Sequence, residues 1–295
     1  MPPPDLLYKY TSCETALVIL DSGCLRWSSP SLFNDIAEFK KRPRFNPTLE
    51  EAHKNLLVPY LIDIATGKRE MPTKKLSKYC QGLLSLIKML LDSGEDAKAI
   101  LDEALKEEDR NIDVMLAESI EPETTKWDSS FARVICFTEC SSDNLMWAHY
   151  AANHTGIVLG FRHVPELDTP FMKAKPVRYS AGNPIIGSGL DYYLYGDHLE
   201  LGRLTTEAIY YTKGPEWSYE KEWRVITWCK EEISKAYSDF KFYPEELDSI
   251  CIGVRFDEDK NEEIFDLINA KYPHCSIFRM IQDGPGTICR TQITT

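Results

Sequence analysis

Apolar residues form short runs near both ends of the chain, and these runs differ in period from the middle of the chain. Runs bounded by Gly, Pro, Asn, Asp or Ser are typical of β-strands. We expect strands over residues 6–10, 25–29, 133–138, 156–161, 177–179, 222–228, 249–254 and 276–281.

Helical periodicity replaces these runs in the middle of the chain. Between residues 47 and 120, apolar positions recur three or four apart, as in Leu83, Leu84, Ile87, Leu90 and Leu91. We therefore expect three or four helices there, forming a helical insertion. Further helices are predicted at four places: after a Thr11 or Ser12 cap up to Gly23, and over 143–150, 190–212 and 257–272.

Strands clustered at both ends around a helical middle indicate an α+β fold with a mainly antiparallel core. The predicted division is a core formed by residues 1–46 and 121–295, with the helical insertion at 47–120.

Composition narrows the function classes. The 295 residues carry a net charge of −12, the opposite of the Lys and Arg surplus that a general nucleic-acid binder needs. The charge favours a protein or small-molecule substrate. Nine cysteines without a CxxC spacing indicate buried free thiols rather than a disulfide framework or a zinc site, so no metal is expected.

The cellular location is also predicted from the sequence. The N-terminal residues lack the basic start and apolar run of a signal peptide, and no apolar stretch reaches the ~20 residues that span a bilayer. We expect a cytoplasmic protein without a membrane partner.

Three short segments concentrate polar and aromatic side chains. They are 8–11, 27–35 and 220–224. Because side chains alternate along a strand, Glu220, Glu222 and Arg224 are expected on one face. Two acids side by side raise each other's pKa unless cations such as Arg224 or Lys9 compensate, which is typical of a site. The alternative is an edge strand whose charged face meets water.

A family resemblance enters at these residues. The segments LYKYTS…ALVILDSGCLRWSSPSLFND, VICFTE…DNLMWAHYAANHTGIVLGF and EWSYEKEWRV resemble the bacterial family called domain of unknown function 2971. One departure is Ile36-Ala37-Glu38, where the family pattern has Pro-Phe-Glu.

That family is in turn distantly similar to the ADP-ribosyltransferase superfamily, especially toxins that modify DNA. The resemblance implies a split-sheet core. Lys9-Tyr10-Thr11 matches the first-strand motif, with Lys9 where a His or Arg is usual, and Glu220-Lys221-Glu222 matches the final motif. The serine motif falls on Ser28 and Ser29, or on Thr138.

The resemblance implies NAD as the substrate. Glu222 would stabilise the oxocarbenium-like ribose, and Glu220 would orient or deprotonate the acceptor. Lys9 and Thr11 would hold a ribose or the phosphates, and Tyr8, Tyr10 or Trp27 would stack on the nicotinamide. The remaining predicted binding residues are Ser28, Ser29, Asn34, Asp35, Trp147, His149, Tyr150 and Arg224. For Trp147 and His149, a packed aromatic helix is the structural alternative.

The implied function is a toxin or phage-defence effector that transfers ADP-ribose to a protein or nucleic acid, or hydrolyses NAD. An antitoxin or regulatory partner would accompany it. Three alternatives remain open. Lys9 in place of His fits an inactive nucleotide- or partner-binding module, the acids with Lys221 resemble those of a metal-dependent nuclease, and Cys136 or Cys140 is a nucleophile candidate with His149.

Overall fold

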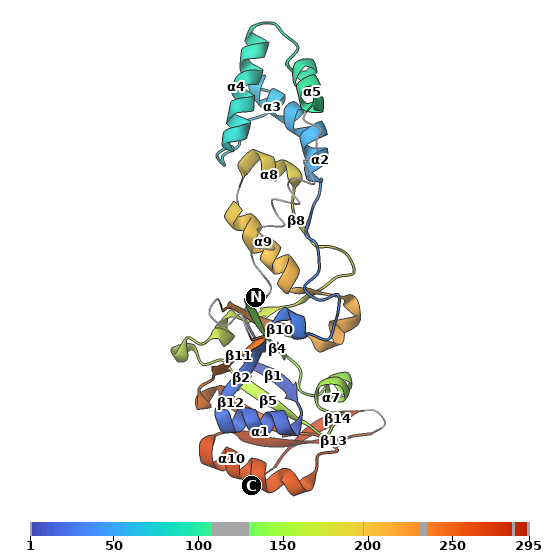
Figure 1. Ribbon diagram of the computed structural model, residues 1–295, viewed down its shortest axis with the longest axis vertical. Coiled ribbons are helices and arrows are strands. Elements are labelled where there is room, and N and C mark those ends of the chain that lie inside the picture. Colours follow the sequence, from blue (N-terminus) through green and yellow to red (C-terminus); the bar gives the residue numbers. More distant parts are fainter. Residues whose placement is uncertain (1, 108–129, 197, 230–234, 285–286, 294–295) are drawn as a thin grey trace. The chain divides into compact units, whose positions relative to one another are not determined.

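A computed structural model describes residues 2–107, 130–196, 198–229, 235–284 and 287–293. The chain forms two compact units (Figure 1). The first, here called the sheet unit, comprises Met1–Glu38, Ser129–Ala181 and Lys213–Thr295. The second, the helical unit, comprises Phe39–Asp128 and Gly182–Thr212.

A 10-stranded sheet forms the sheet unit. Its strand order is β11-β2-β4-β1-β5-β12-β13-β14, and β10 pairs with β4 and β6 outside this path. The strands are β1 (Leu6–Thr11), β2 (Cys24–Ser28), β4 (Ala132–Thr138), β5 (Ile157–Arg162), β6 (Lys175–Pro176), β10 (Glu222–Trp228), β11 (Tyr237–Lys241), β12 (Leu247–Ile252), β13 (Ser276–Gln282) and β14 (Ile288–Gln292).

Strand β4 has three neighbours. β10 pairs along its whole length, from Glu222 opposite Thr138 to Trp228 opposite Ala132. The other edge of β4 is shared, because Tyr8 of β1 lies opposite Thr138 and Ser28 of β2 lies opposite Val134. β1 and β2 therefore border different ends of β4 and leave a fork between them.

Local sequence signals set the connection between β1 and β2. The Ser12 side chain accepts a hydrogen bond from Thr15 N and caps helix α1 (Cys13–Ser22). Gly23 ends the helix in the left-handed region, at φ 63°. The apolar face of α1 packs on the main core, in which Leu20 and Leu159 are fully buried.

Helix α10 (Asn261–Lys271) joins β12 to β13, the parallel pair of this sheet. The remaining pairs along the sheet are antiparallel. The predicted α+β class with a mainly antiparallel core is confirmed. Strands β11 and β14 were not predicted, because charged residues interrupt their apolar pattern.

The helical unit has its own apolar core, in which Leu57, Leu61, Ile87 and Leu194 are buried. Its elements are α2 (Leu49–Glu51), a π-helix (Ala52–Leu57), α3 (Val58–Ala65), α4 (Lys78–Asp92), α5 (Ala97–Glu107), α8 (Gly189–Tyr195), α9 (His198–Tyr210), β3 (Arg44–Phe45) and β8 (Ile185–Gly187).

The helix expected over 190–212 is divided between α8 and α9, and Gly196 ends α8 at φ 59°. Both helices group with the helical unit, although the sequence-based division put them in the core. The part of the predicted insertion at 108–120 lies outside the described residues.

Two further findings concern the described part of the chain. All nine cysteines are free thiols, as predicted. Among the described helices, none is sufficiently long and apolar to cross a membrane.

Candidate functional site

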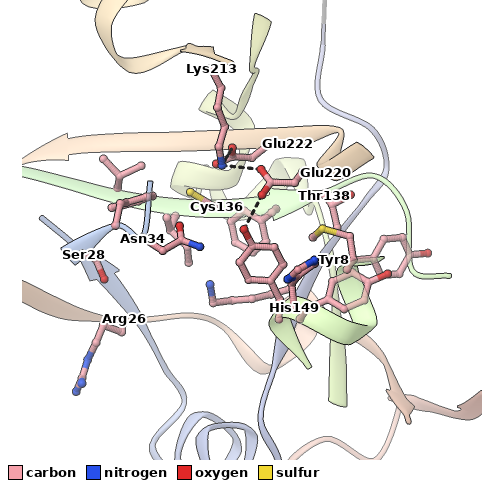
Figure 2. Close-up of a pocket in the computed structure, with 18 of the residues that line it drawn as sticks. Tyr8, Arg26, Ser28, Asn34, Cys136, Thr138, His149, Lys213, Glu220 and Glu222 are labelled. Atoms are coloured by element: carbon pink, nitrogen blue, oxygen red, sulfur yellow. Dashed lines mark hydrogen bonds and ion pairs between the residues drawn. The ribbon is translucent and has the colours of Figure 1, made fainter. Parts of the chain in front are cut away.

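A cavity of about 440 Å³ opens in the sheet unit at the fork between β1 and β2 (Figure 2). This volume falls in the range of small-molecule sites, about 300–1,000 Å³. Helix α7 (Asn144–Tyr150), capped by Asp143, borders it together with β4 and the start of β10. The predicted site residues that line it are Tyr8, Lys9, Tyr10, Ser28, Asn34, His149, Tyr150, Glu220 and Glu222.

The alternation of β2 decides which of its side chains reach the cavity. Arg26 and Ser28 line it, whereas Leu25 and Trp27 point to the other face and are 1% and 3% exposed. Trp27 packs edge-on against Phe240, with ring centroids 5.2 Å apart. Trp27 therefore does not line this cavity, in contrast to the prediction that it stacks on a ligand there.

Four other predicted residues lie beside the cavity without lining it. Ser29 and Thr11 are buried. Asp35 accepts a hydrogen bond from Ala37 N at 2.9 Å and stabilises its own turn. Trp147 is fully buried, and its Nε1 donates to Ser141 O at 2.9 Å. Trp147 therefore supports the wall that Tyr10 forms, in the manner of a packed aromatic helix.

Glu222 begins β10 and is 5% exposed. Arg224 binds its carboxylate with two nitrogens: Nε lies 2.7 Å from Oε1 and Nη2 lies 2.8 Å from Oε2. The side chains share one face because the two residues are two positions apart on a strand. Glu222 N donates to the Tyr179 hydroxyl at 2.8 Å, which fixes the start of the strand.

Lys213 connects the acids of the site. Its Nζ lies 2.7 Å from Glu220 Oε2, 3.4 Å from Glu222 Oε2 and 3.5 Å from Glu38 Oε1. Figure 2 shows its ammonium group reaching Glu220 and Glu222. One buried cation therefore offsets the repulsion between neighbouring carboxylates.

Glu220 reaches this cluster by another route than the one predicted. It ends a 3-10 helix, Pro215–Glu220, and Lys221 follows with a left-handed φ of 43° before the strand starts. Glu220 is thus not on the strand with Glu222, as alternation predicted. The turn brings it to Lys213, and its Oε1 accepts a hydrogen bond from the Tyr150 hydroxyl at 2.6 Å.

Glu38 completes the charged cluster, although sequence reasoning gave it no role in the site. Its side chain is 0% exposed and contacts Arg224 through Oε1. Its Oε2 is buried and has no hydrogen-bond partner in the described part of the chain. Three acids, Glu38, Glu220 and Glu222, therefore surround two cations.

Burial controls protonation in this cluster. It raises the pKa of Glu222 to about 7, and Lys213 opposes that shift while Glu220 adds to it. Burial alone would lower the pKa of Lys213, but Glu222 and Glu220 together raise it. Burial also lowers the pKa of Arg224, to about 9.

The opposite wall is aromatic. The Tyr10 hydroxyl donates to Cys140 O at 3.0 Å, and the His149 ring lies 6.2 Å from that of Tyr219. Lys9 extends into the fork, with Nζ 6.0 Å from the Phe137 ring centroid. Burial lowers the pKa of Lys9, while Cys136 and Glu222 oppose the shift.

Sequence reasoning missed Lys213 as well as the role of Glu38. A lone lysine among apolar residues, in Tyr210-Tyr-Thr-Lys213-Gly214, was the available signal for it. For Glu38, the signal was its place in the segment where the family pattern carries a glutamate. Within the described ranges, no three His, Cys, Asp or Glu residues form a group that could hold a metal ion.

The site therefore combines buried carboxylates with paired cations on one side and tyrosine rings on the other. Such an arrangement can stabilise developing positive charge and bind a planar group. It contains neither Trp27 nor a directly exposed Arg224.

Comparison with known proteins gives one match. No curated protein and no solved structure matches the chain. Residues 146–225 match the family model described as protein of unknown function, DUF2971. This segment carries His149, Tyr150, Lys213, Glu220 and Glu222, and the match confirms over these residues the predicted resemblance to the domain of unknown function 2971 family.

Proposed function

We propose that the sheet unit cleaves the nicotinamide glycosidic bond of NAD and transfers ADP-ribose to a macromolecule or to water. The supporting observation is the position of Glu222, a nearly buried carboxylate at the wall of a cavity with tyrosines opposite. The shared Lys9-Tyr10-Thr11 and Glu220-Lys221-Glu222 pattern of the ADP-ribosyltransferase superfamily supports the same reaction.

In the proposed reaction, the bond between the ribose C1′ and the nicotinamide nitrogen breaks, and nicotinamide leaves with the electron pair. The ribose then carries oxocarbenium-like positive charge, which the ionised Glu222 stabilises. An acceptor nucleophile or water forms the new bond to C1′, and its proton passes to Glu220. Tyr150 donates a hydrogen bond to Glu220 and fixes its orientation.

Tyr8 and Tyr10 would bind the planar parts of NAD, and Ser28 and Asn34 would donate or accept hydrogen bonds at the other end of the cavity. Arg224 acts through Glu222, which it holds with two hydrogen bonds. A role as a toxin or defence effector, with an antitoxin or regulator as partner, rests on the family resemblance.

A second candidate is a module that binds a nucleotide or a partner without chemistry. The observation that favours it is the two-point contact of Arg224 with Glu222, because a carboxylate that is already paired has less charge to offer an oxocarbenium. Lys9 in the place of His also favours this reading.

One experiment separates the two candidates. Purified protein is incubated with NAD labelled in the nicotinamide ring, alone and with cell lysate, and release of free nicotinamide is measured. We expect release by wild type, a loss of at least 100-fold in Glu222→Gln, and no change in Glu258→Gln, a control at an exposed acid.

Binding is measured in parallel as the shift of the melting temperature with NAD. A shift without nicotinamide release would support the binding module. Full activity of Glu222→Gln, or neither release nor binding by wild type, would contradict the proposal. Magnesium-dependent cleavage of added nucleic acid would instead identify a nuclease.

A further inference from the structure

A second cavity lies on the other face of the sheet. It has a volume of about 440 Å³, and Leu25 and Trp27 line it, whereas their neighbours Arg26 and Ser28 line the first cavity. Since alternate residues of β2 point to opposite faces, the two cavities are separated by the sheet. The proposed NAD reaction does not use the second cavity.

The walls of the second cavity are aromatic. Trp27, Phe171 and Phe242 are each less than 9% exposed, and Phe240 lies at the edge with 36% of its surface exposed. Ring faces attract organic cations as well as hydrocarbon groups. The walls therefore suit a ligand with a hydrophobic body, and they tolerate positive charge.

Two buried polar side chains line the same cavity. Glu246 is 1% exposed and Thr169 is 6% exposed. Glu246 Oε2 accepts a hydrogen bond from Tyr243 N at 2.8 Å, which caps the 3-10 helix Pro244–Glu246. Glu246 Oε1 and Thr169 Oγ1 have no hydrogen-bond partner among the residues described.

An unpartnered buried carboxyl oxygen is unfavourable, because it has lost water and gained no donor. The cap at Tyr243 requires one oxygen of Glu246 and leaves the other available. A ligand that donates an N–H to this oxygen would restore the missing hydrogen bond. Exposed Lys173 and Lys241, also among the lining residues, keep the cavity mouth from attracting cations without a hydrophobic body.

We propose that this second cavity binds a small organic amine whose ammonium group donates to Glu246 Oε1 and Thr169 Oγ1 and whose hydrophobic body packs against Trp27 and Phe242. The ligand class follows from the combination of one buried acceptor pair with aromatic walls. This makes the sheet unit a two-site protein, with one cavity on each face.

The test uses the full chain and two probes of the same shape, 2-phenylethylamine and 2-phenylethanol. Binding is followed by NMR through the indole N–H signal of Trp27, assigned with a Trp27→Phe variant. We expect a saturable shift with the amine and at least tenfold weaker binding of the alcohol. Glu246→Gln is expected to weaken the amine at least tenfold.

A second variant keeps the proposal testable if Glu246→Gln does not fold. Thr227→Trp fills the cavity from β10 and leaves the Tyr243 cap intact, so we expect it to abolish binding of both probes. Glu222→Gln, on the other face, is expected to leave the Trp27 shift unchanged. The proposal is overturned if the amine gives no saturable shift, if amine and alcohol bind equally, or if Thr227→Trp binds as wild type does.

Discussion

Glu38 and Arg224 lie 186 positions apart in the chain and are in direct contact inside the sheet unit, with both side chains 0% exposed. Glu38 thus supplies part of the negative charge that lets a guanidinium remain buried beside Glu222. Removing one partner of a buried ion pair leaves the other uncompensated, which costs more than the pair itself contributes.

We expect Glu38→Gln to lower the free energy of unfolding by roughly 3 kcal/mol, measured by urea denaturation. The matched control is Asp239→Asn, whose partner Arg26 is 54% exposed. Because an exposed pair contributes less than about 1 kcal/mol, the control is expected to change little. Equal effects of the two variants would show that Glu38 has no special role in holding Arg224.

The stability of the protein is expected to depend on pH through Glu222. Burial raises its pKa from 4.5 to about 7. A raised pKa in the folded state favours the protonated form, so its contribution is complete below pH 4.5 and is lost as the pH rises through 7. Relative to Glu222→Gln, wild type should lose about 3 kcal/mol of unfolding free energy over this range.

Urea denaturation of both proteins at intervals from pH 4.5 to 8 measures this difference. A constant difference would show that Glu222 does not titrate there. A difference that favours wild type increasingly with pH would show that Arg224 and Lys213 hold the carboxylate ionised against the effect of burial.

Gly156 lies where the turn after α7 meets β1. A Cβ at this position would lie 2.2 Å from Thr11 O and 2.9 Å from Ala151 O, both backbone atoms that cannot move aside alone. We expect Gly156→Ala to destabilise the protein by about 1–3 kcal/mol. Gly182→Ala is the control, since nothing lies within 4 Å of its Cβ position. Thermal unfolding of the two variants decides, and equal melting temperatures would contradict the expectation.

The strands could be predicted where apolar residues were uninterrupted. The runs of β4, β5 and β10 gave the correct positions because both faces of these strands are largely buried. β11 carries exposed residues on both faces and has no such run, so only its pairing with β2 defines it. Pairing between distant segments is a tertiary property that no local pattern contains.

The candidate site was predictable in part for the same reason. Alternation correctly put Glu222 and Arg224 on one face of β10, but the left-handed Lys221 placed Glu220 by a turn that alternation does not describe. Lys213 and Glu38 come from other parts of the chain, and only the fold brings them to Arg224 and Glu222. Trp27 was assigned to the wrong face because the register of β2 against β4 was unknown.

The sharing of β4 by three strands constrains how related sequences can vary. Val134 and Thr138 set the positions of Ser28, Tyr8 and Glu222 at once, since each of these lies directly opposite one of the two. Gaining or losing a single residue within β4 would turn one of its ends over and separate the two walls of the cavity. Homologues that retain this cavity should therefore keep the length of this segment fixed, and differences in length should fall in the connections outside it.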